Sequence, residues 1–412
     1  MKRSLLALAA GAGMVVVTAV PGVADGREGG LDPARLQAGL DGIHKAGMPG
    51  VFASVRDGRA TWRGASGVAD TRTGRPVRPE MRHRVGSVTK SFVAAAVLQQ
   101  VEKGRIRLDD PIGKHLPRLV PGPRGRRITV RMLLNHTSGI GDYVMSAFPS
   151  FQQNSPKSLD DNRHRAFRPA ELIGLGLKAP ATGEPGSTPG SYSNTNYVVL
   201  GQLIEKVTGT RAEAYITRNV IRRAGLRNTA FPAGEAIRAP HSRMYEALYG
   251  LIDPPRDYSV YNMSWAGTAG SLLSTMDDLN RFYRQLLGGK IVSRGMVARM
   301  QRTVPVRAGT TGPGSPYGLG IYPMRLPCGT FWGHDGAVWG AGTLSATRSD
   351  GKRQLSYAIN LMKYNTLDGS GNPRPHPIDK AVPPFFLQAT CGVGEGSAGA
   401  ALAPRSLPLG GR

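Results

Sequence analysis

A serine and a lysine three residues apart form the first pair in this sequence whose spacing could support catalysis. Ser87 and Lys90 lie in residues 84–98, where Gly86 is followed mainly by Ala, Val and Leu. Apolar residues on almost every side predict a helix that is buried on most sides, with Ser87 in its first turn and Lys90 on the same face. Burial and the positive end of the helix dipole both lower the pKa of a lysine. A neutral Lys90 amine could therefore activate the Ser87 hydroxyl as a nucleophile.

The spacing alone does not decide between catalysis and structure. Ser349 and Lys352 have the same spacing, but the intervening Asp350-Gly351 predicts a hairpin turn between two strands. The start of a buried helix favours Ser87 as the reactive serine. The structural alternative is that Ser87 caps the helix and Lys90 extends its amine to solvent.

The N-terminal residues have the pattern of a secretory signal peptide. A basic start is followed by an apolar run over residues 5–20 and by small residues up to Ala24, so we expect residues 1–24 to be removed after Ala24. The apolar run is short for a membrane-spanning helix and contains glycines. We therefore expect a secreted protein with no membrane insertion. Residues 392–412, rich in Gly, Ala and Pro, predict a disordered tail.

The formal net charge is +25, and +23 remains once Lys2 and Arg3 are removed with the signal peptide. The basic residues are mostly arginines scattered along the chain, without a basic tract interleaved with aromatics, so we expect no nucleic acid partner. The charge favours residence near an anionic cell envelope.

In an exported protein the two cysteines, Cys328 and Cys391, predict a disulfide, with two free thiols as the alternative. Two cysteines without clustered histidines exclude a structural zinc site, and we expect no metal.

Hydrophobic periodicity divides the chain into an α/β (α+β) part and a helical part. Hairpin and alternation signals at both chain ends predict an antiparallel sheet flanked by helices, formed by residues 31–107 and 265–391. An all-helical subdomain over residues 108–264 is inserted between them, and it contains a polar loop at 149–162 without periodicity. The expected helices are 31–46, 130–135, 169–177, 196–208, 211–220, 276–287 and 378–390; the expected strands are 51–55, 60–65, 317–323, 329–333, 342–348 and 354–361.

Two further motifs contain polar residues that could face a substrate. Tyr192, Ser193 and Asn194 precede a predicted helix, and on their own they indicate a turn that caps it. His334, Asp335, Gly336 and Ala337 follow a predicted strand, and on their own they indicate a bulge or a close approach of another backbone.

The three motifs, in this order, resemble the serine β-lactamase and penicillin-binding-protein superfamily, above all its exported soluble D-alanyl-D-alanine carboxypeptidases. Class C β-lactamases and esterases share the pattern. The resemblance extends over residues 31–391 and includes the placement of the cysteine pair. Its sequence matches are residues 85–92 (VGSVTKSF), 133–139 (LLNHTSG), 192–197 (YSNTNY) and 318–320 (GLG).

The resemblance implies a role for each matching residue. Ser87 would accept the acyl group, Lys90 would take its proton or hold the base network, and Asn194 would bind the substrate amide. Tyr192 would be a general acid/base, which requires a nearby cation such as Lys90 to lower its pKa. No cofactor is implied, and β-lactams are expected to acylate the protein.

The third motif would provide the oxyanion hole and part of the substrate site. The backbone N–H groups of Ser87 and Ala337 would bind the oxyanion, and His334 takes the position that is Lys in most penicillin-binding proteins. Phe148 and Trp265 match aromatic residues that line the cleft in the carboxypeptidases, although either could be ordinary core.

The third motif also departs from the carboxypeptidase pattern, which is usually His-Thr-Gly-Thr. Asp335 replaces a hydroxyl that helps to bind the substrate carboxylate. Tyr322 occupies the position of a carboxylate-binding arginine, for which Arg325 could substitute. An aspartate would repel a substrate carboxylate, but it would suit a substrate with a free ammonium group.

These features predict an exported serine hydrolase that forms an acyl-enzyme on a peptide or ester substrate. The first expectation is a D-alanyl-D-alanine carboxypeptidase acting on peptidoglycan-type peptides; the alternatives within the superfamily are a D-aminopeptidase or amidase and an esterase. An alternative of another class is a non-catalytic envelope protein that binds peptidoglycan. The presence of Ser87, Lys90, Tyr192 and Asn194 together favours the enzyme.

Overall fold

The structure is a computed structural model that describes residues 30–238, 240–309 and 312–392. The predicted signal peptide and the predicted tail beyond residue 392 lie outside the described residues. Within the described part, no helix is both long enough and apolar enough to cross a membrane.

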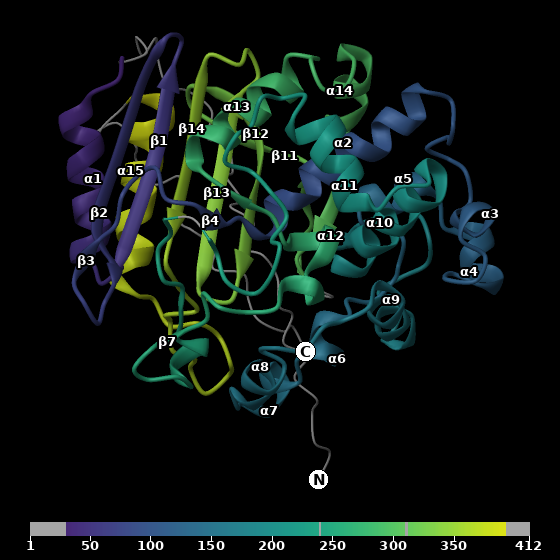
Figure 1. The fold of residues 1–412 in the computed structure, drawn as a ribbon, viewed down its shortest axis with the longest axis horizontal. Coiled ribbons are helices and arrows are strands. Elements are labelled where there is room, and N and C mark those ends of the chain that lie inside the picture. Colours follow the sequence, from purple (N-terminus) through teal and green to yellow (C-terminus); the bar gives the residue numbers. More distant parts are fainter. Residues whose placement is uncertain (1–29, 239, 310–311, 393–412) are drawn as a thin grey trace.

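A seven-stranded antiparallel sheet is built from both ends of the chain, as predicted (Figure 1). Its order is β11-β12-β13-β14-β1-β2-β3, and β1 from the N-terminal part pairs with β14 from the C-terminal part, with Val51 opposite Ile359. The strands are β1 (Gly50–Asp57), β2 (Ala60–Asp70), β3 (Arg75–Pro76), β11 (Tyr322–Leu326), β12 (Gly329–Val338), β13 (Ala341–Arg348) and β14 (Arg353–Ile359).

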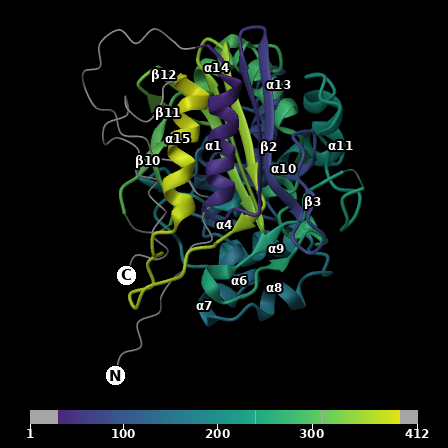
Figure 2. The same ribbon diagram turned by 90° about the vertical axis from the view of Figure 1, so that its left-hand side faces the viewer.

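Two helices cover each face of this sheet. On one face, α1 (Pro33–Lys45) and α15 (Pro377–Cys391) lie side by side (Figure 2). Gly39 of α1 has no side chain, and this allows the two helices to approach closely. A Cβ at Gly39 would lie only 3.0 Å from the Phe385 ring of α15. On the other face, α2 (Thr89–Glu102) packs against α13 (Met276–Leu287) through stacked rings of Phe92 and Phe282, with centroids 3.6 Å apart.

The region 108–264 is mainly helical, but it is not all-helical as expected, because it also contains three two-residue strands. Figure 1 shows its helices gathered beside and below the sheet. The helices are α3 (Ile112–His115), α4 (Gly122–Arg127), α5 (Val130–Leu134), α6 (Val144–Ala147), α7 (Ser150–Gln153), α8 (Lys157–Asp161), α9 (Pro169–Lys178), α10 (Asn194–Thr208) and α11 (Ala212–Ile216), with a π turn at Thr217–Ile221; the strands are β5 (Gly190–Ser191), β6 (Tyr245–Glu246) and β7 (Arg256–Asp257).

The expectation of an irregular loop at residues 149–162 is wrong, because this segment contains the helices α7 and α8. Ser150 and Ser158 hold these short helices together by exchanging backbone-to-hydroxyl hydrogen bonds of 2.9 and 2.8 Å. Hydrogen bonds between polar side chains and the backbone therefore stabilise these two helices, and such bonds leave no hydrophobic periodicity in the sequence.

The expectation of one continuous strand over residues 317–323 is also wrong, because a turn divides this segment. β10 (Ser315–Tyr317) pairs with β9 (Val304–Arg307), and β11 begins only at Tyr322. Between them the Gly318 N–H donates to the Ile321 carbonyl at 2.8 Å, and Gly320 takes a left-handed φ of +78°. The remaining short elements are β4 (His83–Arg84), β8 (Leu273–Ser274), β15 (Leu361–Met362), α12 (Gly267–Gly270), α14 (Arg294–Met300) and the 3₁₀ turns Leu248–Gly250 and Met263–Trp265.

A disulfide joins Cys328, between β11 and β12, to Cys391 at the end of α15, with Cα atoms 5.4 Å apart. It ties the edge of the sheet to the helix that covers its face. Closing a loop of this length restricts the unfolded chain and so stabilises the fold in the chain-entropy model.

Candidate active site

Ser87 lies just ahead of α2 rather than in its first turn. It sits in a 3₁₀ turn, η1 (Gly86–Val88), which Gly86 enters with a left-handed φ of +51°. The Ser87 side chain is buried. The 3₁₀ turn continues directly into α2, so Ser87 and Lys90 still share one face, as the spacing predicted.

The Lys90 amine is fully buried and has three hydrogen-bond acceptors. Its Nζ donates to Ser87 Oγ at 2.9 Å, to Asn194 Oδ1 at 2.8 Å and to the Ala269 carbonyl at 2.8 Å. A lysine ammonium has three donors, so each is satisfied inside the protein. The alternative in which Lys90 reaches solvent is therefore wrong. Burial lowers the pKa of Lys90 to about 7, against the opposing effect of nearby carboxylates, so the amine is partly neutral near neutral pH.

Asp142 holds the amide of Asn194 in the orientation that Lys90 requires. One Asp142 oxygen accepts from Asn194 Nδ2 at 2.7 Å, which turns the Asn194 oxygen toward Lys90. The other Asp142 oxygen accepts from the Val144 N–H at 3.0 Å. Sequence reasoning missed Asp142, which lies three residues after the matched segment 133–139 and carries no motif of its own.

Tyr192 lies against the same lysine, in the short connection between β5 and α10. Lys90 Nζ is 4.9 Å from the centre of the Tyr192 ring. Burial raises the pKa of Tyr192 well above its usual value, and the adjacent Ser87 hydroxyl only partly opposes this shift. The expectation that Lys90 lowers this pKa is therefore wrong. Tyr192 is therefore a phenol that keeps its proton at neutral pH, and Lys90 is the group whose pKa suits a general base.

The edge of β12 beside Ser87 is open on the side where β11 ends. β11 pairs with β12 only as far as Tyr322 opposite Gly333, so residues 334–338 extend past it. The nucleophile turn lies over the face of β12 at backbone contact, which leaves this edge free: a Cβ on Gly336 would be 2.0 Å from the Val85 carbonyl and 2.7 Å from the Ser87 nitrogen. A Cβ on Gly86 would likewise be 2.5 Å from the Ala337 nitrogen. The two backbone nitrogens predicted to form an oxyanion hole are thus brought together.

His334 is neutral, unlike the lysine that most penicillin-binding proteins have at this position. Burial, with the charge of Lys90, lowers the pKa of His334 to about 3. Its Nδ1–H donates to the Asp335 carbonyl at 2.5 Å, which leaves Nε2 to accept from the Tyr317 hydroxyl at 3.0 Å. His334 therefore adds no positive charge to the site.

Asp335 places a buried carboxyl group at the position where the carboxypeptidases bind a carboxylate. The Tyr322 hydroxyl donates to Asp335 Oδ1 at 3.1 Å, and burial raises the pKa of Asp335 to about 7. Lys90 is the cation whose charge opposes that shift. Arg325 is exposed and lies opposite Thr330, near the far end of β11, so it does not substitute for the missing arginine.

The two aromatic residues expected to line the cleft belong to a buried cluster. Phe148 is fully buried, in agreement with ordinary core, and contacts the edges of Trp265 and Trp339 at centroid distances of 5.1 and 5.0 Å. Trp265 stacks on Trp339 at 4.7 Å. Trp339, which directly follows β12, was missed because its role depends on this packing.

The described residues contain no group of three or more His, Cys, Asp or Glu side chains arranged to hold a metal ion. The chemistry available from these residues is nucleophilic attack by Ser87 with Lys90 as base, which is the chemistry of a serine acyl-transfer enzyme.

The chain belongs to the Beta-lactamase family, whose model matches residues 34–377. Its fold is that of a D-stereospecific amidohydrolase from Streptomyces sp., with a TM-score of 0.75 and 34% identity over 88% of this chain and 100% of that chain. It is 34% identical to esterase EstB of Burkholderia gladioli over 50% of this chain and 55% of the esterase. It is 26% identical to a D-aminopeptidase of Brucella anthropi over 72% of this chain and 53% of that protein.

The chain thus spans little more than half the length of these two curated relatives. Penicillin-binding proteins are also among its relatives. The relatives place the chain in the serine hydrolase superfamily, and they include enzymes that act on amides, esters and peptides.

The close contact between η1 and β12 leads to a test of the oxyanion hole. Gly336→Ala forces the two backbones apart, so we expect acylation by a nitrophenyl ester to slow at least about 100-fold, the loss typical of an oxyanion donor. Gly369→Ala is the matched control, because a Cβ there meets nothing within 4 Å. Equal acylation rates for both variants, measured by stopped-flow absorbance, would contradict the arrangement.

Proposed function

We propose that this protein is a serine amidohydrolase that cleaves amides or peptides of D-amino acids with a free amino group through an acyl-enzyme. The observation that carries the proposal is Asp335, a buried carboxyl group beside the Lys90–Ser87 pair at the position expected to face the substrate's charged end. The 34% identical amidohydrolase and the D-aminopeptidase support the substrate class, and the D configuration is taken from them.

Acylation follows from the hydrogen bonds around Lys90. Neutral Lys90 takes the proton of Ser87 while Oγ attacks the substrate carbonyl carbon. The resulting oxyanion accepts hydrogen bonds from the N–H groups of Ser87 and Ala337. As the carbon–nitrogen bond breaks, the Tyr192 phenol donates its proton to the leaving amine, and the Lys90 ammonium then returns a proton to the phenolate.

Release of the acyl group uses the same residues in the reverse order. Lys90 is neutral again, so it can accept a proton from a water molecule that attacks the Ser87 ester. Collapse of this second tetrahedral intermediate returns the electron pair of the broken bond to Ser87 Oγ, and the Lys90 ammonium donates to Oγ the proton that it took from the water, which leaves Lys90 neutral. Asn194 positions Lys90 in both steps through its 2.8 Å hydrogen bond.

Asp335 distinguishes this function from the carboxypeptidase expected first. Above a pH of about 7 its ionised carboxylate attracts an ammonium group and repels a terminal carboxylate. Tyr322, in place of an arginine, donates a hydrogen bond to Asp335 and contributes no charge.

The signal-peptide pattern supports placing the hydrolase outside the cell.

The nucleophile can be identified directly by covalent labelling. We expect a fluorescent penicillin or a fluorophosphonate to label the wild-type protein and not Ser87→Ala, because no other serine has a buried lysine amine as partner within the described hydrogen bonds. Intact-protein mass spectrometry would locate the adduct. Ser349→Ala, which alters the exposed serine with the same spacing to a lysine, is the control and should label fully. Labelling of Ser87→Ala at the wild-type rate would refute an acyl-enzyme at Ser87.

Substrate charge tests the role of Asp335. We expect D-alanine 4-nitroanilide to be cleaved faster than its N-acetyl derivative, and Asp335→Asn to lower kcat/KM for the free amine about 10- to 100-fold, the loss typical of a charge-assisted hydrogen bond. A short-chain nitrophenyl ester has no charge to recognise and should be hydrolysed equally by both proteins at a pH of about 9, where Lys90 is neutral in each. Preferred cleavage of a D-Ala-D-Ala tripeptide would instead establish the carboxypeptidase.

The lowered pKa of Lys90 predicts a rise in acylation rate with pH. The base must be neutral, so the rate should increase as pH passes through about 7 and level off above it. Asp335 titrates in the same range, so Asp335→Asn, assayed on the uncharged ester, removes the Asp335 titration from the profile. Because the charge of Asp335 raises the pKa of Lys90, the midpoint in this variant should lie below that of the wild type. Single-turnover rates from pH 5 to 10 measure the profile. A midpoint near the ordinary lysine value of 10.5 would contradict Lys90 as the base.

A further inference from the structure

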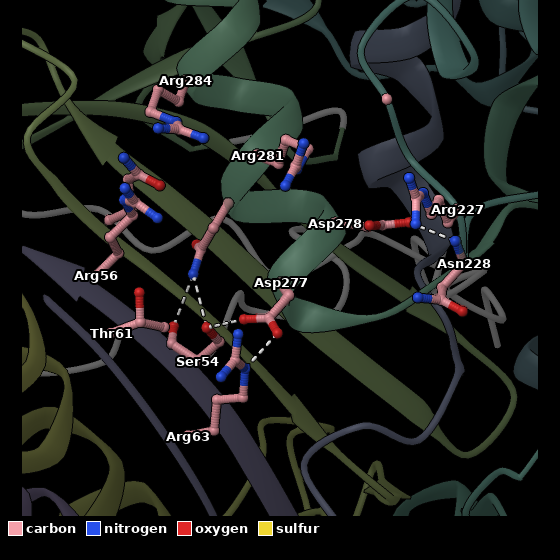
Figure 3. A pocket seen from close by; sticks show the side chains of 13 residues that line it. Ser54, Arg56, Thr61, Arg63, Arg227, Asn228, Asp277, Asp278, Arg281 and Arg284 are labelled. Carbon is pink, nitrogen blue, oxygen red and sulfur yellow. Dashed lines mark hydrogen bonds and ion pairs between the residues drawn. The ribbon is translucent and has the colours of Figure 1, made fainter. Parts of the chain in front are cut away.

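An arginine-rich groove lies apart from the active site, between α13 and the strands β1, β2 and β14. Its volume is about 490 Å³, and its arginines are Arg56, Arg63, Arg227, Arg281 and Arg284 (Figure 3). These arginines come from β1, β2, α13 and the segment that follows residue 225. We call this feature the arginine groove. None of its lining residues belongs to the site around Ser87.

The two carboxylates of the arginine groove are already bound by the protein itself. Asp277 accepts a 2.5 Å hydrogen bond from Ser54 and forms an ion pair with Arg63. Asp278 accepts from the Asn228 N–H at 2.7 Å and from the Thr229 hydroxyl at 2.9 Å. Five arginines against two aspartates leave the groove with a net charge of +3.

The remaining arginines crowd one another. Arg227, Arg281 and Arg284 form no ion pair with any residue in the described part of the chain. The Nε of Arg284 is buried without a hydrogen-bond acceptor. Burial lowers the pKa of Arg284, and so do the positive charges of Arg56 and Arg281, so Arg284 lies close enough to both to be repelled by them. In Figure 3 Arg56 and Arg284 lie on one side of α13, and Arg281 extends on its other side, toward the segment that carries Arg227.

Other elements hold this crowded arrangement in place. A Cβ on Gly225 would lie 3.4 Å from Arg281 Nη1, so this guanidinium rests against the loop that carries Arg227. Arg56 Nε donates to the Gly58 carbonyl at 2.9 Å, which fixes its position at the β1–β2 turn. Asn280 bonds to Ser54 from the same helix as Arg281 and so anchors α13 to the sheet.

We propose that the arginine groove binds a ligand that carries phosphate groups. Guanidinium groups offer paired N–H donors that match phosphate oxygens, and several of them around one space favour an anion with more than one charge. A volume of about 490 Å³ exceeds what a single phosphate ion fills, and it leaves room for an organic body or for a second phosphate.

The test is calorimetric titration of the full chain with pyrophosphate at fixed ionic strength. We expect saturable binding, with inorganic phosphate weaker, and at least a tenfold loss of affinity in the double variant Arg281→Gln/Arg284→Gln. The double variant Arg126→Gln/Arg218→Gln removes the same charge from exposed positions outside the groove and should bind within twofold of wild type. Hydrolysis of the nitrophenyl ester at the wild-type rate shows that each variant is folded.

Three results would overturn the proposal. Equal losses in the two double variants would show that net charge alone attracts pyrophosphate. Acetate or short poly-glutamate binding as tightly as pyrophosphate would show a carboxylate site or a general polyanion surface instead. If the groove variant loses its esterase activity, Arg227→Gln is the replacement, and unchanged pyrophosphate affinity in that variant would also count against the site.

Discussion

The buried amine of Lys90 is the interaction on which the rest of the site depends. A lysine removed from water is tolerated only if its donors are bonded, and the three acceptors here come from η1, α10 and the α12 segment. Burial also produces the lowered pKa that makes the amine a base. The close packing of α2 on nearly all sides is therefore a condition for the chemistry, because an exposed Lys90 would remain charged at neutral pH.

The two sides of the site have separate tasks. Lys90 is hydrogen-bonded to Ser87 and Asn194 and lies beside the Tyr192 ring, and in the proposed mechanism these residues move the protons. On the β12 side, a neutral histidine and a buried acid replace the cationic and hydroxyl groups of the carboxypeptidases. Substrate choice within the superfamily can therefore change through residues that do not take part in proton transfer.

Residue spacing and hydrophobic periodicity in the sequence predicted the structural features that depend on residues close together in the chain. The spacing of Ser87 and Lys90 and the helix at 276–287 were recovered in this way. The sheet from both chain ends was also predicted, because strands at each end of the chain needed partners. Asp142 and Trp339 were missed because their roles arise only when distant segments meet. The direction of the Tyr192 pKa shift was wrong for a similar reason: its burial, which the sequence does not show, outweighs the nearby lysine.

The pairing of β1 with β14 makes assembly of the active site a late event. Ser87 lies in the first quarter of the chain, but β12 and the strand that closes the sheet against β1 come near its end. Contacts so distant in sequence form slowly and only after most of the chain is available. A growing or truncated chain that carries the serine but not β12 therefore lacks the Ala337 N–H of the predicted oxyanion hole, and we expect it to react with esters far more slowly than the complete fold.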